Sequence, residues 1–340
     1  MSQDAGPAAG SGAGTGTRSR RPGRAGTLLR LVVRRMLWAV PLLFVVSVTS
    51  FALMALVPGD PARAVLGPTA SAEQVEALSR EMGLDRPLPE QYAGWLDRAV
   101  HGDLGTSLYT GADVESLLRA RLEPTVSLIL LSALVAAVVG VLLGLTSAVR
   151  GGVLGRLVDV LSAAGLAVPS FWFALLLVSW FAVRWRVFPP TGYTPAGTSA
   201  AEWLRSLALP AAATALPAVT GMAKQTRDAV LDALHLSFVR VMQANGLSRS
   251  SILFRHVLRN AAGPILSLLG VITAGLLGAT VLIENIFGLP GLGSAAALAA
   301  LQHDIPVLQG TVITFTLIVI AIGLLVDVCQ AWLDPRTGVR

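Results

Sequence analysis

Few residues of this 340-residue chain are placed to perform covalent chemistry. The only lysine, Lys224, has alanine before it and glutamine after it, so the Gly-Lys-Ser/Thr core of a Walker A nucleotide-binding loop is absent. A single cysteine excludes an intrachain disulfide. None of the four histidines lies in the His-Glu-x-x-His pattern or in another paired spacing typical of a zinc site. They are His101, His235, His256 and His303. The sequence therefore predicts no catalytic residue, no metal site and no cofactor bound by this chain.

Three polar features beside apolar segments each allow two interpretations. Glu284 and Asp327 stand at the ends of apolar runs, where an ionisable group either serves function or simply reaches interfacial water. The run Gly-Leu-Pro-Gly-Leu-Gly from Gly288 superficially resembles a phosphate-cradling loop. It lacks the G-x-G-x-x-G order and contains proline, so we expect it to set loop geometry. The pair His303–Asp304 could touch a metal substrate, although a solvated loop pair is the simpler interpretation.

The composition is that of a membrane protein. Hydrophobic residues make up 54% of the chain and charged residues 14%, whereas a soluble chain carries about 25% charged residues. The apolar residues also gather in long charge-free runs that a soluble core does not require. A net charge of +6 could indicate a nucleic-acid partner, but seven arginines lie between Arg18 and Arg35, directly before the first apolar run. That distribution is typical of membrane orientation, so we expect membrane lipid as a partner and no nucleic acid.

Six charge-free runs of about 18 to 26 residues are suited to cross a membrane as helices, since about 20 residues suffice. The runs are Leu37–Val57, Pro124–Val149, Val160–Val183, Ser206–Ala223, Asn260–Ile283 and Ile305–Val326. The fourth is the shortest and contains Pro210 and Pro217, which packed helix bundles tolerate. Pro169 is expected to kink the third. The sequence therefore predicts an all-α polytopic membrane protein with six transmembrane helices.

Arginines in the short loops set the expected orientation. Residues 1–26 form a basic tail, expected to be disordered, and the segment from Arg227 to Arg259 carries five arginines. The loop Asn285–Asp304 carries no lysine or arginine. The excess of positive charge on the cytoplasmic side of membrane proteins places the tail and the arginine-rich segment in the cytoplasm, and with them both termini.

Residues 27–123 are expected to hold the first span and an extracellular helical cap. Ser71 can cap an amphipathic helix that runs to Met82, with Gly83 as its stop. A second helix is expected around Pro89–Val100.

The most informative segment runs from Phe238 to Asn260. It reads as two short helices broken at Gly246, where glycine lets the backbone turn. Apolar Leu247 beside basic Arg249 begins an amphipathic element. Such a helix could lie in a groove on a soluble partner or rest on anionic lipid headgroups, and residue types alone favour neither.

The same segment resembles the cytoplasmic coupling loop of ABC importer permeases, above all those of the dipeptide/oligopeptide/nickel family. The pattern there is similar to Y-V-R-T-A-R-A-K-G-L-S, followed after a few residues by R-H-A-L-R-N. Met242 and Asn245 depart from it, at positions where small or basic residues are usual. The matching positions are Val239, Arg240, Ala244, Gly246, Leu247, Ser248, Arg255, His256, Leu258, Arg259 and Asn260.

Further stretches resemble the same family in the same order, so that the resemblance covers about residues 30 to 337. They are Val57–Pro61, Gly83–Leu88, Gly102–Ser107, Glu284–Gly293 with Asp304–Pro306, and Leu333–Arg336.

The resemblance implies the first of two membrane-spanning permease subunits of an ATP-driven importer, a multi-pass protein of the plasma membrane. Residues 124–340 would form its transmembrane core, with the cytoplasmic coupling loop at 225–262. The implied partners are a second permease subunit, two cytoplasmic ATPase subunits that bind the ATP, and an extracellular substrate-binding protein. Peptides are the leading substrate, and nickel or another small solute is the alternative.

The resemblance also implies roles for individual residues. ATPase coupling falls to Val239, Arg240, Ala244, Gly246, Leu247, Ser248, Arg249, Arg255 and His256. Contacts with the binding protein, or a gate, fall to Asp60, Asp103, Glu284 and Asp304. The rival interpretation is a secondary transporter driven by an ion gradient. It requires ionisable residues near the middle of a span and inverted repeats, and neither is visible in this sequence.

Overall fold

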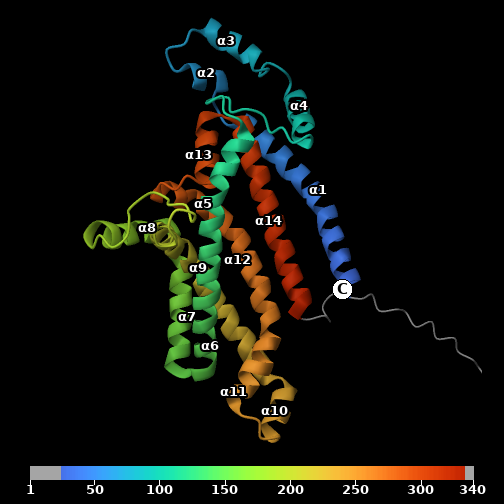
Figure 1. The fold of residues 1–340 in the computed structure, drawn as a ribbon, viewed down its shortest axis with the longest axis vertical. Coiled ribbons are helices and arrows are strands. Elements are labelled where there is room, and N and C mark those ends of the chain that lie inside the picture. Colours follow the sequence, from blue (N-terminus) through green and yellow to red (C-terminus); the bar gives the residue numbers. More distant parts are fainter. Residues whose placement is uncertain (1–23, 334–340) are drawn as a thin grey trace, which may run out of the picture.

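The computed structural model describes residues 24–333, most of which are helical (Figure 1). Within that range there is no β-strand, only an isolated bridge between Thr106 and Asp113. The predicted all-α class is confirmed. The predicted tail lies outside the described residues, apart from its last three, which begin α1.

The helices of the bundle are α1 (Arg24–Leu56), α5 (Val114–Val135), η1 (Ala136–Gly140), α6 (Val141–Arg150), α7 (Gly152–Ala167), α8 (Ser170–Leu177), η2 (Val178–Arg184), α9 (Ala200–His235), α12 (Leu258–Phe287) and α14 (Ile305–Leu333).

Five helical stretches of the described chain are long and apolar enough to cross a membrane. A sixth crossing requires Gly155–Ala167 and Ser170–Arg184 to be taken together, and these two are bent by 97°. All six predicted runs therefore fall on apolar helices. The five continuous stretches are Val32–Leu56, Val114–Arg150, Ala200–His235, Arg249–Phe287 and Ile305–Trp332.

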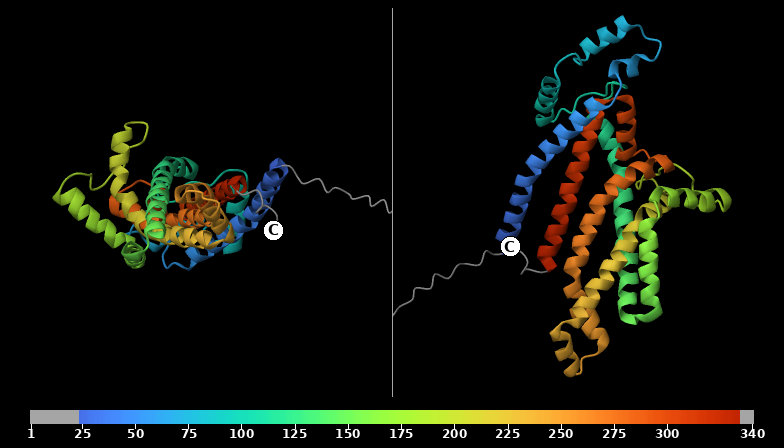
Figure 2. Two further views of the ribbon diagram at one scale, coloured as in Figure 1. Left: turned by 90° about the horizontal axis from the view of Figure 1, so that it is seen from below. Right: turned by 180° about the vertical axis from the view of Figure 1, so that it is seen from behind.

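The third span is broken, a sharper change of direction than the predicted kink. α7 ends at Ala167, Val168 is extended with a ψ of 120°, and α8 begins at Ser170. Proline disfavours the helical conformation of the residue before it, which explains why the helix stops just before Pro169. α8 and η2 consequently project sideways from the bundle (Figures 1 and 2).

α9 is the centre of the bundle and packs against α5, α6, α7, α8 and α12. Pro210 and Pro217 both lie inside this continuous 36-residue helix. Neighbouring helices surround it more fully than any of the other four continuous spans, and such packing is what allows proline in a transmembrane helix. The shortest of the predicted runs is thus part of the most buried helix.

Two glycines allow the helix of η1 and α6 to approach α9 closely. A Cβ atom on Gly140 would lie 2.6 Å from the Cβ of Met222, and one on Gly144 would lie 2.6 Å from the Cβ of Thr226. Small residues at such positions are typical of tight packing between transmembrane helices. This contact joins α6 to the C-terminal half of α9, which carries Met222 and Thr226.

α1 packs on α14 at the side of the bundle (Figure 1). The Arg35 guanidinium forms an ion pair with the carboxylate of Asp327. Gly323 leaves the room that this guanidinium occupies, since a Cβ atom there would collide with it. Asp327, predicted to be a functional group or an interfacial acid, is therefore a partner of an arginine on a neighbouring helix.

A cap of three short helices covers the C-terminal end of α1 and the N-terminal end of α14 (Figures 1 and 2). The helices are α2 (Pro61–Leu66), α3 (Ala72–Glu81) and α4 (Leu88–Val100). As predicted, Ser71 caps α3, in a reciprocal arrangement with Gln74, and Gly83 follows its end with a φ of +68°. α4 is tied to α1 because the Tyr92 and Ser47 hydroxyls lie 2.9 Å apart, within hydrogen-bond distance.

Candidate functional site

The segment singled out by sequence forms the end of the bundle opposite the cap (Figure 1). It consists of α10 (Ser237–Ala244), α11 (Arg249–Ser251) and the π-helical turn η3 (Ile252–Val257). α10 follows α9 directly, and η3 continues into α12. We call residues 236–260 the tip. The tip is therefore held between two of the longest helices of the bundle.

The turn at Gly246 takes the form that sequence predicted. The amide of Leu247 donates to the carbonyl of Met242 at 3.2 Å, and that of Gly246 donates to the carbonyl of Gln243 at 3.0 Å. These two bonds are those of a Schellman motif, in which the residue after the helix adopts a left-handed conformation. Gly246 has a φ of +77°, and a Cβ atom there would meet nothing within 4 Å. Glycine is needed for its backbone conformation and not for space.

Apolar side chains fix the tip to the bundle. Val239 is 1% exposed, and Ile252 and Val257 are equally buried. They pack in one cluster with Val230 of α9 and Ile265 of α12. Val239, a predicted coupling residue, faces inward and positions the rest of the tip.

The outward face of the tip combines arginines with apolar side chains. Arg240, Arg249 and Arg255 are exposed. Val241 and Phe254 are also exposed, by 59% and 66%. Sequence reasoning missed these two, although both lie next to one of the arginines. Among the remaining predicted coupling residues, Ala244, Leu247 and Ser248 are exposed and His256 is half-buried.

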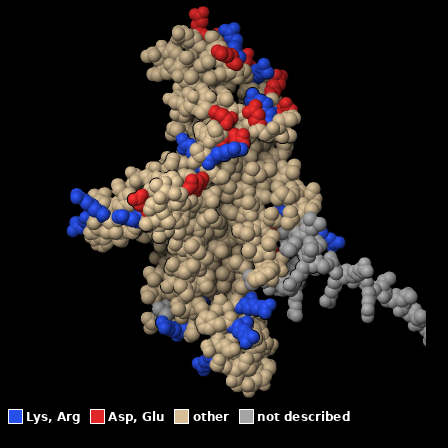
Figure 3. Space-filling view, in the orientation of Figure 1, with Lys and Arg blue, Asp and Glu red and all other residues tan. Residues whose placement is uncertain are grey.

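The charge at the tip has one sign. No acidic residue occurs between Asp232 and Glu284 in the sequence. Figure 3 shows the consequence, since Lys and Arg side chains stand out on this end and no acid is visible there on the face shown. A surface of this kind attracts an acidic partner.

At the opposite end of the bundle Glu284 is fully buried. Its carboxylate accepts a hydrogen bond from the Thr125 hydroxyl at 2.6 Å and another from the Ser294 amide at 2.8 Å. The Thr125 hydroxyl oxygen in turn accepts from the amide of Leu292 at 2.7 Å. Glu284 thus joins α12 and α5 to α13 (Leu292–Gln302), a short helix inside the predicted loop Asn285–Asp304.

The glycine-rich loop makes room for this carboxylate. A Cβ atom on Gly291 would collide with the Glu284 carboxylate, and one on Gly293 would lie 3.0 Å from it and 2.7 Å from Val281 Cα. The glycines therefore serve loop geometry, as predicted.

Asp304 holds the other end of α13. It is 2% exposed, and it accepts hydrogen bonds from the Ser107 hydroxyl and from the Leu108 amide, the latter at 3.2 Å. The prediction of a solvated His303–Asp304 pair is wrong for Asp304, because the loop before α5 folds over it. The His303 ring lies against the Pro58 carbonyl, 3.2 Å from Nε2.

The other two predicted outer acids shape local turns. Asp60 caps α2 by accepting from the Ala62 amide at 2.9 Å, and exposed Asp103 accepts from the Gly105 amide at 2.8 Å. In this conformation, Asp103 is the one outer acid of the four with an exposed side chain. Among the described residues, no group of three or more His, Cys, Asp or Glu is placed to hold a metal ion.

Comparison with known proteins defines the class. Residues 140–339 match the family described as binding-protein-dependent transport system inner membrane component, and residues 28–129 match the N-terminal component of the same systems. The chain belongs to this family: it is a multi-pass permease subunit of an ABC importer in the plasma membrane, and it works as part of a multi-subunit complex.

Individual relatives agree with this placement. A probable peptide ABC transporter permease of Sinorhizobium fredii is 36% identical over 306 residues, covering 90% of this chain and 98% of that protein. The oligopeptide permease AppB of Bacillus subtilis is 33% identical, and the glutathione permease GsiC of Escherichia coli is 34% identical. The alignments cover 90% and 91% of this chain, and 98% of each relative. The MetNI methionine ABC transporter in its inward-facing form shares the fold, with a TM-score of 0.53 at 15% identity over 65% of this chain and 97% of the MetNI chain.

Proposed function

We propose that this permease carries peptides into the cell, and that ATP hydrolysis by partner subunits docked on the tip drives the transport. The substrate proposal is supported by the relatives, which are named for peptide, oligopeptide and glutathione transport. In this proposal the chain itself supplies a translocation path for the substrate and the tip that transmits movement, and it binds no cofactor of its own.

The exposed face of the tip is the observation that carries the coupling proposal. It presents Arg240, Arg249 and Arg255 together with exposed Val241 and Phe254, on a stretch without acids. Exposed apolar side chains and arginines are both enriched at protein–protein interfaces. The buried contacts of Val239 and Ile252 would pass a displacement of the tip to α9 and α12.

The same proposal sets the orientation. An ATPase docks from the cytoplasm, so the tip lies on that side and the cap outside. The N-terminal end of α1 and the C-terminal end of α14 lie towards the tip end of the bundle, which supports cytoplasmic termini (Figures 1 and 2). A second permease subunit, two ATPases and an extracellular binding protein complete the proposed complex.

Co-purification tests the partner set. The chain is tagged, extracted in mild detergent and analysed by mass spectrometry together with a second ABC transporter known to stay intact in that detergent. Recovery of a second permease and an ATPase is the expected result. If this chain is recovered alone while the control complex stays intact, the proposed assembly is wrong.

Uptake into proteoliposomes that carry the purified complex tests the substrate and the energy source. With the binding protein outside and ATP inside, a labelled dipeptide or tripeptide should accumulate, whereas labelled nickel should not. Accumulation should survive a protonophore that collapses the ion gradient. Nickel uptake without peptide uptake would transfer the assignment to the metal substrate, and loss of uptake with the gradient would refute ATP-driven transport.

A further inference from the structure

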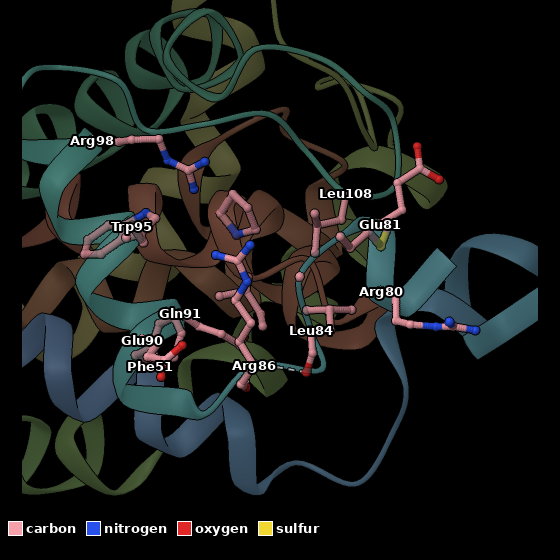
Figure 4. Close-up of a pocket in the computed structure, with 15 residues that line it drawn as sticks. Phe51, Arg80, Glu81, Leu84, Arg86, Glu90, Gln91, Trp95, Arg98 and Leu108 are labelled. Atoms are coloured by element: carbon pink, nitrogen blue, oxygen red, sulfur yellow. Dashed lines mark hydrogen bonds between the residues drawn. The ribbon is translucent and has the colours of Figure 1, made fainter. Parts of the chain in front are cut away.

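A cavity of about 310 Å³ lies between the cap and the outer ends of α1 and α14 (Figure 4). Phe51, Trp95, Leu108 and Pro306 are among the residues that line it. Its size is at the lower end of the range of small-molecule sites, about 300–1,000 Å³, and those sites typically combine apolar walls with a few placed polar groups.

The polar groups that face the cavity are cationic. Figure 4 shows the guanidinium groups of Arg86 and Arg98 pointing towards its middle from opposite sides. Neither forms an ion pair with an acid among the described residues. Three further charged residues line the cavity. Arg80 bonds Glu76 at 3.6 Å and points away, as does Glu81, while Glu90 lies at the edge beside Gln91.

The fold holds this arrangement in place. Gln91 of α4 donates its side-chain amide to the carbonyl of Arg86 at 2.8 Å and to that of Leu84 at 3.1 Å. These bonds fix the loop that carries Arg86. Trp95 is 3% exposed, and its indole N–H has no hydrogen-bond partner among the described residues. Because this N–H is itself closed off from solvent, Trp95 serves the cavity as an apolar wall and not as a donor.

We infer that this cavity binds a carboxylate carried on a small organic group. Two guanidinium groups supply paired donors whose geometry matches a carboxylate. The apolar walls receive the group that bears the carboxylate. The C-terminus of a free peptide and an acidic side chain of an extracellular protein both present this chemistry. The inference depends on the cavity and not on transport.

Chemical labelling tests the inference on the full chain in lipid nanodiscs. Phenylglyoxal modifies accessible arginines, and mass spectrometry gives its rate at each position. An N-acetyl dipeptide with a free C-terminus should slow the labelling of Arg86 and Arg98, while exposed Arg63 of α2 serves as the internal control. The C-terminal amide of the same peptide should protect neither.

Two arms distinguish the sources of the carboxylate. Protection by the free dipeptide assigns the cavity to peptide. Protection only by the purified binding protein, lost when carbodiimide has neutralised its surface acids, assigns it to a protein side chain. Either result supports the inference. Equal protection by the amide, or no protection by dipeptide or binding protein, overturns it and leaves the proposed function intact.

Variants give a second measurement. Arg86→Gln and Arg98→Gln should each weaken binding of the protecting carboxylate by about tenfold or more, as expected for a hydrogen bond to a charged group. The matched control is Arg80→Gln, which removes the arginine that points away and should leave binding unchanged. Unchanged binding in both Arg86→Gln and Arg98→Gln would refute the site.

Discussion

The two ends of the molecule place their charges in opposite ways. At the tip, Arg240, Arg249 and Arg255 face solvent and apolar side chains fix the segment from beneath. Around α13, the acids Glu284 and Asp304 face inward and accept hydrogen bonds from other parts of the chain. Exposed charge can exchange one partner for another at little cost, whereas a buried carboxylate holds its donors in one arrangement. The ends of α5, α12, α13 and α14 that lie beside the cap are therefore joined into one unit, whereas the tip presents its charges to solvent.

The largest expected effect is at the turn of the tip. Gly246→Asp forces a side chain into a left-handed conformation, at a cost of about 1–3 kcal/mol, and adds an acid to a basic face. Transport should fall by about 100-fold or more, while the protein still inserts in the membrane. Peptide uptake measures transport, and the amount of the variant recovered in the membrane measures insertion.

Gly151→Asp is the matched control for the turn. Gly151 has a φ of +57° with open space around it, in the loop between α6 and α7, outside the tip. The ψ of Gly151 is −152°, in a region that essentially only glycine adopts, so Gly151→Asp imposes at least as much backbone strain as Gly246→Asp. It does so without touching the proposed docking face, so most transport should remain. Normal uptake in Gly246→Asp would refute the coupling role of the tip.

The next largest effect concerns the opposite end. Glu284→Ala leaves the Ser294 amide and the Thr125 hydroxyl without their acceptor in a buried place. The free energy of unfolding should fall by about 2–4 kcal/mol. Denaturation in mixed micelles measures it. Asp103→Ala removes an exposed acid and should cost less than about 1 kcal/mol. Equal losses in the two variants would show that the buried carboxylate does not hold α13 in place.

A smaller effect is expected from single arginines of the tip. Arg240→Gln, Arg249→Gln or Arg255→Gln should each weaken ATPase binding by about threefold to tenfold at low salt. The difference should shrink at high salt, because the screening length falls from about 10 Å at 0.1 M to about 3 Å at 1 M. Arg63→Gln on the cap is the control and should change nothing. Salt-independent losses would contradict an electrostatic role.

The smallest effect compares helix caps at the two ends. Ser71→Ala removes a two-way cap from the ten-residue α3 and should cost about 1 kcal/mol, seen as faster amide hydrogen exchange in α3. Ser248→Ala removes a one-way cap at 3.3 Å from the start of α11 and should cost less. The opposite order would mean that the tip depends on local capping and not on its buried valines.

Sequence reasoning succeeded where the signal was local. Long apolar runs predicted every span, Ser71 predicted the start of α3, and Gly246 predicted the turn of the tip. It failed where the outcome depends on distant contacts. Glu284 meets Thr125 across 159 positions of sequence, and no nearby pattern reveals that its carboxylate turns inward.

The element boundaries show the same limit. α13 carries no charge and is too short to span a membrane, so a search for spans passes over it, although its alanines and leucines favour a helix. α5 begins at Val114, ten residues before the predicted span, because the helix extends past Arg119 and Arg121 to the cap. Proline did not predict helix ends consistently: Pro169 marks a break, while Pro210 is held inside α9 by its neighbours.

The π-helical turn η3 has a further consequence for how rotation can pass through the chain. A π-helical turn holds an extra residue within an otherwise regular helix, and each residue of an α-helix advances the helix by about 100°. The face of α11 and the face of α12 are therefore out of phase, although one continuous helical stretch joins them. If the π-helical turn shifted by one residue along this stretch, one residue would leave the helical register of α11 and join that of α12, or the reverse. η3 therefore marks the point at which the register of the helix changes between the tip and the membrane span.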